Sequence, residues 1–149
     1  MNRIFALALT ALLAVSQAFA ADPAKKAEDL VKKAALFIKE KGKDAALKEF
    51  NNPKGKFVDG EFYVFAFTMG NIGLAHPMNP GMVGKDVSNL PDADGKHFFK
   101  TFQDVVNKSG SGWVDYKWNN PVTKKIQQKS SYVMKIDGQD MYIGCGIYK

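Results

Sequence analysis

Residues 112–149, GWVDYKWNNPVTKKIQQKSSYVMKIDGQDMYIGCGIYK, carry the strongest structural signal in the chain. Apolar and aromatic residues alternate with polar ones along three runs, which is the period of β-strands with two chemically different faces. Asn119-Asn120-Pro121 and Asp137-Gly138 separate the runs, and the second suits a tight hairpin because Gly tolerates positive φ. The runs cover residues 113–118, 126–136 and 141–148. The stretch therefore predicts an antiparallel meander of three strands.

The residues before this meander predict helices and two further strands. Apolar side chains recur at helical spacing along residues 24–50, and Gly42 divides this segment into a long and a short helix. Residues 61–69 are rich in aromatic and β-branched residues and are typical of a strand, Gly70-Asn71 is a turn signal, and residues 72–76 are expected to form the returning strand. Residues 96–107 again show helical periodicity. The order predicts an α+β fold, in which a long N-terminal helix packs on a five-stranded antiparallel sheet of the PAS-like kind.

The first twenty residues carry a processing signal. Arg3 gives a positive start, an apolar run follows, and Ala18-Phe19-Ala20 fits the small-x-small cleavage pattern. The apolar run is too short for a stable membrane span. We expect residues 1–20 to be a cleaved signal peptide and residues 21–149 to form one periplasmic domain that does not span the membrane. An uncleaved N-terminal anchor is the alternative.

Charge and cysteine content narrow the function. The net charge is +6, Arg3 accounts for one of these charges, and every other basic residue is lysine. Without arginine in the mature chain there is no bidentate reader of guanine, so we expect no nucleic-acid partner. The lysines are interpreted as a solvated surface or an attraction for anionic partners. Cys145 is the only cysteine, which excludes an internal disulfide and argues against a structural zinc cluster.

Recognisable catalytic motifs are missing from the sequence. There is no nucleophile elbow around the serines, no P-loop, and no Gly-x-Gly-x-x-Gly between a strand and a helix. Residues 92–95, DADG, are similar to part of a calcium loop, but the downstream glutamate of such a loop is absent. We therefore expect a binding protein without a cofactor and without enzymatic activity.

His76 is a candidate ligand-binding residue. It ends a strand-like run, precedes Pro77, and begins a loop rich in Met, Asn and Pro. An imidazole in this position can project into a cavity between sheet and loop and donate to an anion. Two alternatives stay open. The ring can bond the backbone of its own loop, or it can ligate haem together with Met78 or Met82, although no Cys-x-x-Cys-His motif is present.

The strands of the meander supply further candidates. Tyr116 and Trp118 share one face of their strand, and Lys129 and Tyr132 lie in the next strand. Tyrosine hydroxyls, an indole N–H and an ammonium group suit a small carboxylate inside an apolar box. The alternative for each aromatic residue is a core position with its polar tip at the surface.

Taken together, these segments resemble the single Cache domain of type 2, a family of extracellular sensor modules. The likeness covers almost the whole mature chain in the right order. It rests on residues 73–77 (GLAHP), 79–80 (NP), 83–86 (VGKD), 94–96 (DGK), 112–121 (GWVDYKWNNP), 129–133 (KSSYV) and 143–148 (IGCGIY).

The resemblance implies a ligand pocket between the sheet and the loops after its second strand. It also implies a small-molecule ligand, often a short organic acid, as the input of chemoreceptors and sensor kinases. It places His76, Tyr116, Trp118, Lys129 and Tyr132 at the pocket, with Lys129 and His76 as the partners of the anion.

Members of that family usually sit between two transmembrane helices and continue into a signalling module, whereas this chain ends at Lys149. We therefore expect a free-standing periplasmic sensor that acts in chemotaxis or signal transduction through a separate membrane receptor or kinase. The first alternative is an interaction protein that keeps the fold with a closed pocket and docks through its basic surface. The second is a haem-binding protein.

Overall fold

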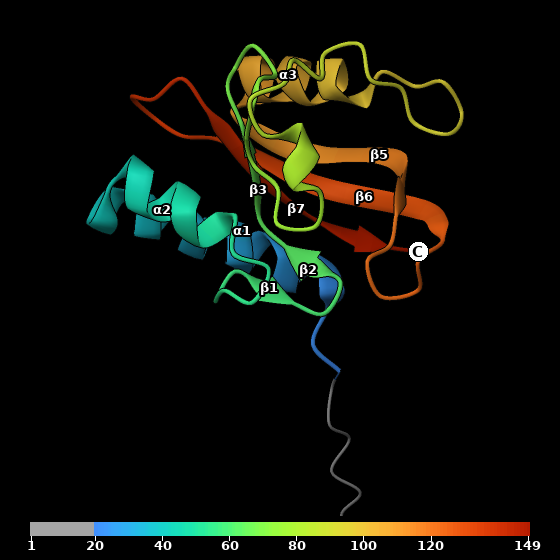
Figure 1. Ribbon diagram of the computed structural model, residues 1–149, viewed down its shortest axis with the longest axis horizontal. Helices are drawn as coiled ribbons and strands as arrows, with labels where there is room; N and C mark the ends of the chain where they lie inside the picture. The colour runs from blue at the N-terminus through green and yellow to red at the C-terminus, as the bar shows by residue number, and fades with distance from the viewer. Residues whose placement is uncertain (1–19) are drawn as a thin grey trace, which may run out of the picture.

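The computed structural model describes residues 20–149 (Figure 1). The signal peptide expected at residues 1–20 lies outside the described residues, apart from residue 20 itself. The described elements, in chain order, are α1 (Pro23–Lys41), α2 (Lys43–Phe50), β1 (Val58–Asp59), β2 (Phe62–Tyr63), β3 (Phe65–Phe67), β4 (Gly73–Ala75), the 3-10 helix η1 (Pro80–Met82), α3 (Phe98–Ser109), β5 (Ser111–Asn119), β6 (Ile126–Lys135) and β7 (Tyr142–Tyr148).

The main sheet has five strands in the order β4-β3-β7-β6-β5. All neighbouring pairs are antiparallel, and β5, β6 and β7 form the predicted meander. The β6–β7 turn contains Gly138 at φ 73°, the positive value expected for the Asp-Gly dipeptide. β3 pairs with β7, so residues from the first half of the chain lie beside its last strand. The α+β fold with a five-stranded antiparallel sheet is confirmed.

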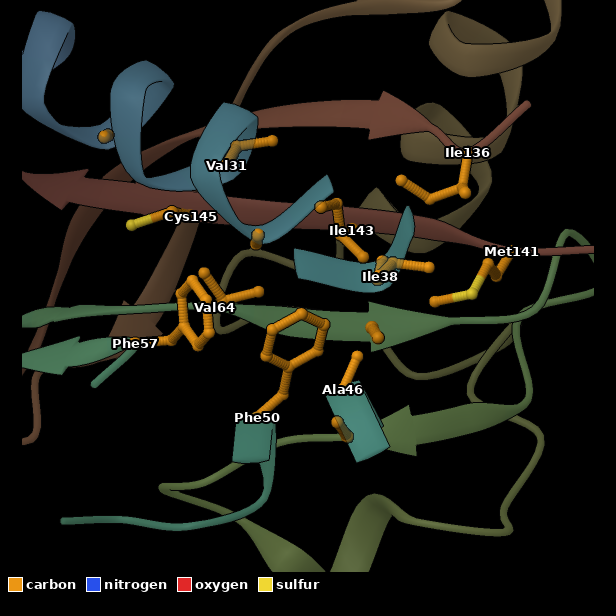
Figure 2. Packing of buried hydrophobic residues seen from close by; sticks show 14 residues of the cluster. Val31, Ile38, Ala46, Phe50, Phe57, Val64, Ile136, Met141, Ile143 and Cys145 are labelled. Carbon is orange, nitrogen blue, oxygen red and sulfur yellow. The ribbon is translucent and has the colours of Figure 1, made fainter. Parts of the chain in front are cut away.

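α1 covers one face of the sheet because its apolar residues recur every three or four positions. Ala27, Val31, Ala34 and Ile38 are buried on this stripe. The helix begins after Asp22, whose side chain accepts a hydrogen bond from the Ala24 N–H, and it ends at Gly42. Figure 2 shows the resulting core, in which residues of α1 and α2 pack on the strands. Cys145 of β7 is fully buried in this core.

α3 covers the other face of the sheet (Figure 1). Its apolar residues Phe98, Phe99, Phe102 and Val106 are buried, as the helical periodicity predicts. They pack against side chains of β3, β5 and β7, most of which are aromatic. The second core is therefore built mainly from rings, and the candidate site lies within it.

Residues 61–69, expected to form one strand, contain two short ones. β2 pairs with β1 in a separate two-stranded sheet, whereas β3 pairs with β4 and β7. The side chains still alternate across this segment, since Tyr63, Phe65 and Phe67 face the α3 side while Val64 and Ala66 face α1. The backbone partners change within the segment, and alternation alone does not reveal such a change.

None of the helices formed by residues 20–149 is both long and apolar enough to cross a bilayer.

Candidate ligand-binding site

Four of the five residues expected at a pocket lie on the α3 side of the sheet. Tyr116 and Trp118 occupy alternate positions of β5, and Lys129 of β6 lies opposite Tyr116. His76 follows β4, and its ring centroid lies 6.2 Å from that of Trp118. The Lys129 Nζ lies 6.0 Å from the centre of the Tyr116 ring. The structure thus brings His76, Tyr116, Trp118 and Lys129 together.

Tyr132 lies on the opposite face of the sheet, which corrects its expected place at the pocket. Its ring centroid lies 5.6 Å from that of Trp113, and both residues pack against the core beneath α1. Side chains alternate along a strand, so Lys129 and Ser131 face α3 whereas Tyr132 faces α1. The three-residue separation between positions 129 and 132 already requires opposite faces.

Two tyrosines that were not predicted from the sequence also surround Lys129. Tyr63 of β2 accepts a hydrogen bond from the Lys129 Nζ at 2.8 Å. Tyr148 of β7 lies opposite Lys129 in the strand register, and its ring centre is 4.8 Å from the same Nζ. Tyr63 was detectable as the first member of the alternating series Tyr63, Phe65 and Phe67, which faces one side of the fold.

Lys129 is a buried cation without an acidic partner. Only 1% of its surface is exposed, and no carboxylate of residues 20–149 lies within 4.0 Å of its Nζ. Its ammonium also faces the Tyr63 ring, 4.2 Å from the ring centre. Burial disfavours the charged form and lowers the pKa of Lys129 to about 7, and Cys145 and Glu61 oppose this shift weakly.

A glycine of β7 makes room for this lysine. A side chain at Gly146 would collide with the stem of Lys129 and with the hydroxyl of Ser131. Ser131 forms a 2.9 Å hydrogen bond with the Tyr116 hydroxyl. Because Gly146 has no side chain, the stem of Lys129 and the hydroxyl of Ser131 can occupy the space beside it. The ammonium of Lys129 then reaches the Tyr63 hydroxyl.

His76 is buried as a neutral ring with a defined tautomer. Its Nδ1 accepts a hydrogen bond from the Asn79 N–H at 3.0 Å, so in the neutral ring the proton is on Nε2. Its backbone N–H donates to Asn51 Oδ1 at 3.1 Å, which anchors the start of the loop. Burial, followed by the charge of Lys129, lowers the pKa of His76 to about 3. The bond to its own loop's backbone, one of the open alternatives, leaves Nε2–H available as an uncharged donor.

Two adjoining cavities meet at His76 and Trp118. The inner cavity is about 10 Å³, roughly the space that the centre of one water molecule needs. Rings of β3, α3 and β5 line it, together with His76 and Trp118. The outer cleft is about 150 Å³ and is lined by His76, Met78, Asn79, Trp118, Asn119, Pro121 and Lys124. His76 and Trp118 therefore separate an aromatic interior from an accessible cleft.

The inner cavity does not fit the haem alternative. A volume of about 10 Å³ beside His76 cannot hold a porphyrin. The Nδ1 of His76 accepts from the Asn79 N–H, so the neutral ring presents a protonated Nε2 with no free lone pair for an iron atom.

Acid should destabilise the protein through His76. Since the pKa of His76 is near 3 in the fold and near 6.5 in the unfolded chain, the unfolded state binds more protons between these values. The free energy of unfolding therefore decreases by roughly 3–5 kcal/mol as the pH falls from about 6.5 to about 3. Denaturant unfolding at pH 7 and pH 4 measures the effect.

The His76→Asn variant keeps an acceptor for the Asn79 N–H but has no titratable ring. Its loss of stability between pH 7 and pH 4 should therefore be smaller than that of the unmodified protein. His97→Gln removes the exposed histidine at the start of α3 and should behave as the unmodified protein. Equal acid sensitivity in His76→Asn and the unmodified protein would contradict the assignment of His76 as a buried neutral ring.

Comparison with known proteins identifies the class that this fold and site define. The family described as single Cache domain 2 matches residues 24–149, and the chain belongs to this family. A solved structure that describes carboxylic acid recognition by a Cache chemosensory domain superposes with a TM-score of 0.75 at 25% identity. The superposition covers 84% of this chain and 92% of the Cache chemosensory domain. A structure described as a periplasmic sensor domain of a chemotaxis protein gives a TM-score of 0.67 at 28% identity, over 83% and 88% of the two chains.

Among curated proteins, the sensor histidine kinase MctS of Rhizobium johnstonii is 33% identical over 92 residues, which are 60% of this chain and 19% of the kinase. The chain spans less than a fifth of the length of the curated relatives it matches. The similar proteins thus include a Cache chemosensory domain, a sensor domain of a chemotaxis protein and a sensor histidine kinase.

Proposed function

We propose that this protein is a periplasmic sensor domain that binds a short monocarboxylate between Lys129 and His76. The observation that carries the proposal is the buried ammonium of Lys129, which has no carboxylate partner among residues 20–149. A buried unpaired charge is costly, and an anionic ligand would remove that cost. The Nε2–H of His76 would add an uncharged donor for the same anion.

The surrounding residues favour a small ligand with one charge. The outer cleft of about 150 Å³ is adjacent to an interior walled by aromatic rings, which suits a short apolar tail. The cleft also holds Lys124 at its rim, whose charge would attract an anion before it enters. Acetate, propionate, lactate and pyruvate meet these conditions.

Export and signalling are part of the same proposal. Residues 1–20 would act as a signal peptide that directs the domain, residues 21–149, to the periplasm. There it would report its ligand to a membrane receptor or kinase. The similarity to a periplasmic sensor domain of a chemotaxis protein and to a sensor histidine kinase supports this role.

A thermal-shift panel tests the proposal. Ligands that bind only the native state raise the melting temperature by mass action, by about 2.7 kcal/mol of added stability at one hundred times Kd. We expect the melting temperature to rise with the concentration of short monocarboxylates. It should not rise with the matched primary amines, because their positive charge would be repelled by Lys129. The unliganded protein in chloride buffer of equal ionic strength is the control.

An interaction protein with a closed pocket is the second candidate, and the small volume of the inner cavity favours it. A flat response to every acid of the panel at millimolar concentration, from well-folded protein, would support this candidate and reject the sensor proposal.

A further inference from the structure

The titratable groups around Lys129 come from every element that packs against it. Tyr63 of β2, Tyr116 of β5 and Tyr148 of β7 present hydroxyl groups or rings to its Nζ. Cys145 lies on β7, His76 follows β4, and Glu61 precedes β2. Glu61 is the one carboxylate of this set, and its Oε2 accepts a hydrogen bond from Asn120 Nδ2 at 3.2 Å. No carboxylate of residues 20–149 pairs with the ammonium within 4.0 Å.

Burial keeps the tyrosines, the cysteine and the histidine of the cluster in their uncharged forms near neutral pH. Burial raises the pKa of Cys145 to about 11 and that of Tyr148 to about 12, and it raises the pKa values of Tyr63 and Tyr116 well above their usual range. The pKa of His76 is lowered to about 3 by burial and by Lys129. Lys129, with a pKa near 7, is therefore the member of this cluster that changes charge between pH 6 and 9.

A bound carboxylate would reverse the effect of burial on Lys129. An opposite charge within about 4–6 Å favours the charged form of a group and raises the pKa of an amine. The free site above neutral pH holds a neutral amine that donates to or accepts from Tyr63, whereas the liganded site holds an ammonium beside the anion. The two states differ by one proton on the lysine nitrogen.

We propose that this site takes up its carboxylate together with a proton, so that an anion and H⁺ enter as a pair and Lys129 carries the proton. The proposal rests on the proposed function, since it requires an anion beside Lys129. The proton is given up by hydronium or a buffer acid in solvent, whose bond to it breaks as the new N–H bond of Lys129 forms, and no covalent bond of the carboxylate changes. The sensor would then respond to a short acid most strongly in neutral to mildly acidic surroundings.

Titration calorimetry with propionate as the probe tests the coupling. Measurements at pH 6, 7, 8 and 9, each in two buffers with different ionisation enthalpies, give both Kd and the number of protons taken up. Propionate is ionised throughout this range. We expect Kd at pH 7 to be about twofold weaker than at pH 6, and approximately tenfold weaker for each pH unit above about pH 8. Proton uptake should rise from near zero at pH 6 toward one per ligand at pH 8–9.

Variants separate Lys129 from the other groups. Lys129→Arg keeps a permanent charge, so any binding it retains should be independent of pH and take up no proton. His97→Gln, at an exposed position outside the cluster, should keep the pH profile of the unmodified protein. If Lys129→Arg fails to fold, the number of protons that the unmodified protein takes up per bound propionate still tests the coupling.

The two possible failures are distinct. Binding of propionate with the same affinity and no proton uptake from pH 6 to 9 would overturn the coupling and leave the sensor function intact. Failure of acetate, propionate, lactate and pyruvate to bind at any of these pH values would overturn both proposals.

Discussion

Replacing Lys129 with methionine should abolish binding of a short carboxylate and, at the same time, raise the stability of the unliganded protein. The proposed site has the buried ammonium of Lys129 as the partner of the anion, and removing one partner of a buried charge pair costs about 2–5 kcal/mol of binding free energy. Because about 1.4 kcal/mol corresponds to a factor of ten, we expect Kd for propionate to rise by roughly 100-fold or more. Calorimetry at pH 6.5, where Lys129 is largely charged, measures the loss.

The expected gain in stability follows from the same burial. Methionine has a similar length and no charge, and replacing buried charges by well-packed apolar groups is often neutral or stabilising by about 1–4 kcal/mol. Lys135→Met, at an exposed position near the end of β6, is the matched control and should change neither property. Retained propionate binding in Lys129→Met would place the anion elsewhere, and a large loss of stability would make Lys129 a structural residue.

Replacing Phe102 with alanine should produce the largest loss of stability among the residues of the site. Phe102 is 1% exposed, and its ring centroid lies within 6.2 Å of the rings of Phe65, Phe98, Phe99, Tyr116 and Tyr142. Deleting such a side chain removes its transfer free energy and leaves a cavity, at a cost of about 3–5 kcal/mol. Urea unfolding of the unliganded protein measures the change.

An exposed residue of the same helix provides the control for this substitution. Asn107→Ala changes α3 without touching the ring cluster and should stay within about 0.5 kcal/mol of the unmodified protein. A loss below about 1 kcal/mol for Phe102→Ala would mean that α3 is held mainly by contacts other than these rings.

The elements that local pattern determines were predicted well from the sequence. The meander β5–β6–β7 follows from alternation and from two strong turn signals. α1 follows from its apolar stripe and ends at Gly42, where φ is 86°. The division of residues 61–69 into β2 and β3 was missed because alternation reports which face a side chain takes, and it carries no information on which strand supplies the backbone partner.

The positions of the expected site residues agree with the structure for four of the five. His76, Tyr116, Trp118 and Lys129 were expected at the pocket, and the structure brings them together. Tyr132 was misplaced because the resemblance to the family outweighed the parity of positions along its own strand. The size of the inner cavity depends on how the rings of α3 pack on the sheet, which a pattern of apolar positions does not determine.

A crystal structure of the protein grown with propionate tests the central proposal most directly. We predict that the carboxylate lies within hydrogen-bond distance of Lys129 Nζ and His76 Nε2, with the alkyl tail toward Trp118 and the rings of α3. Propionate bound away from Lys129, or a site that stays closed and unliganded at saturating propionate, would contradict it.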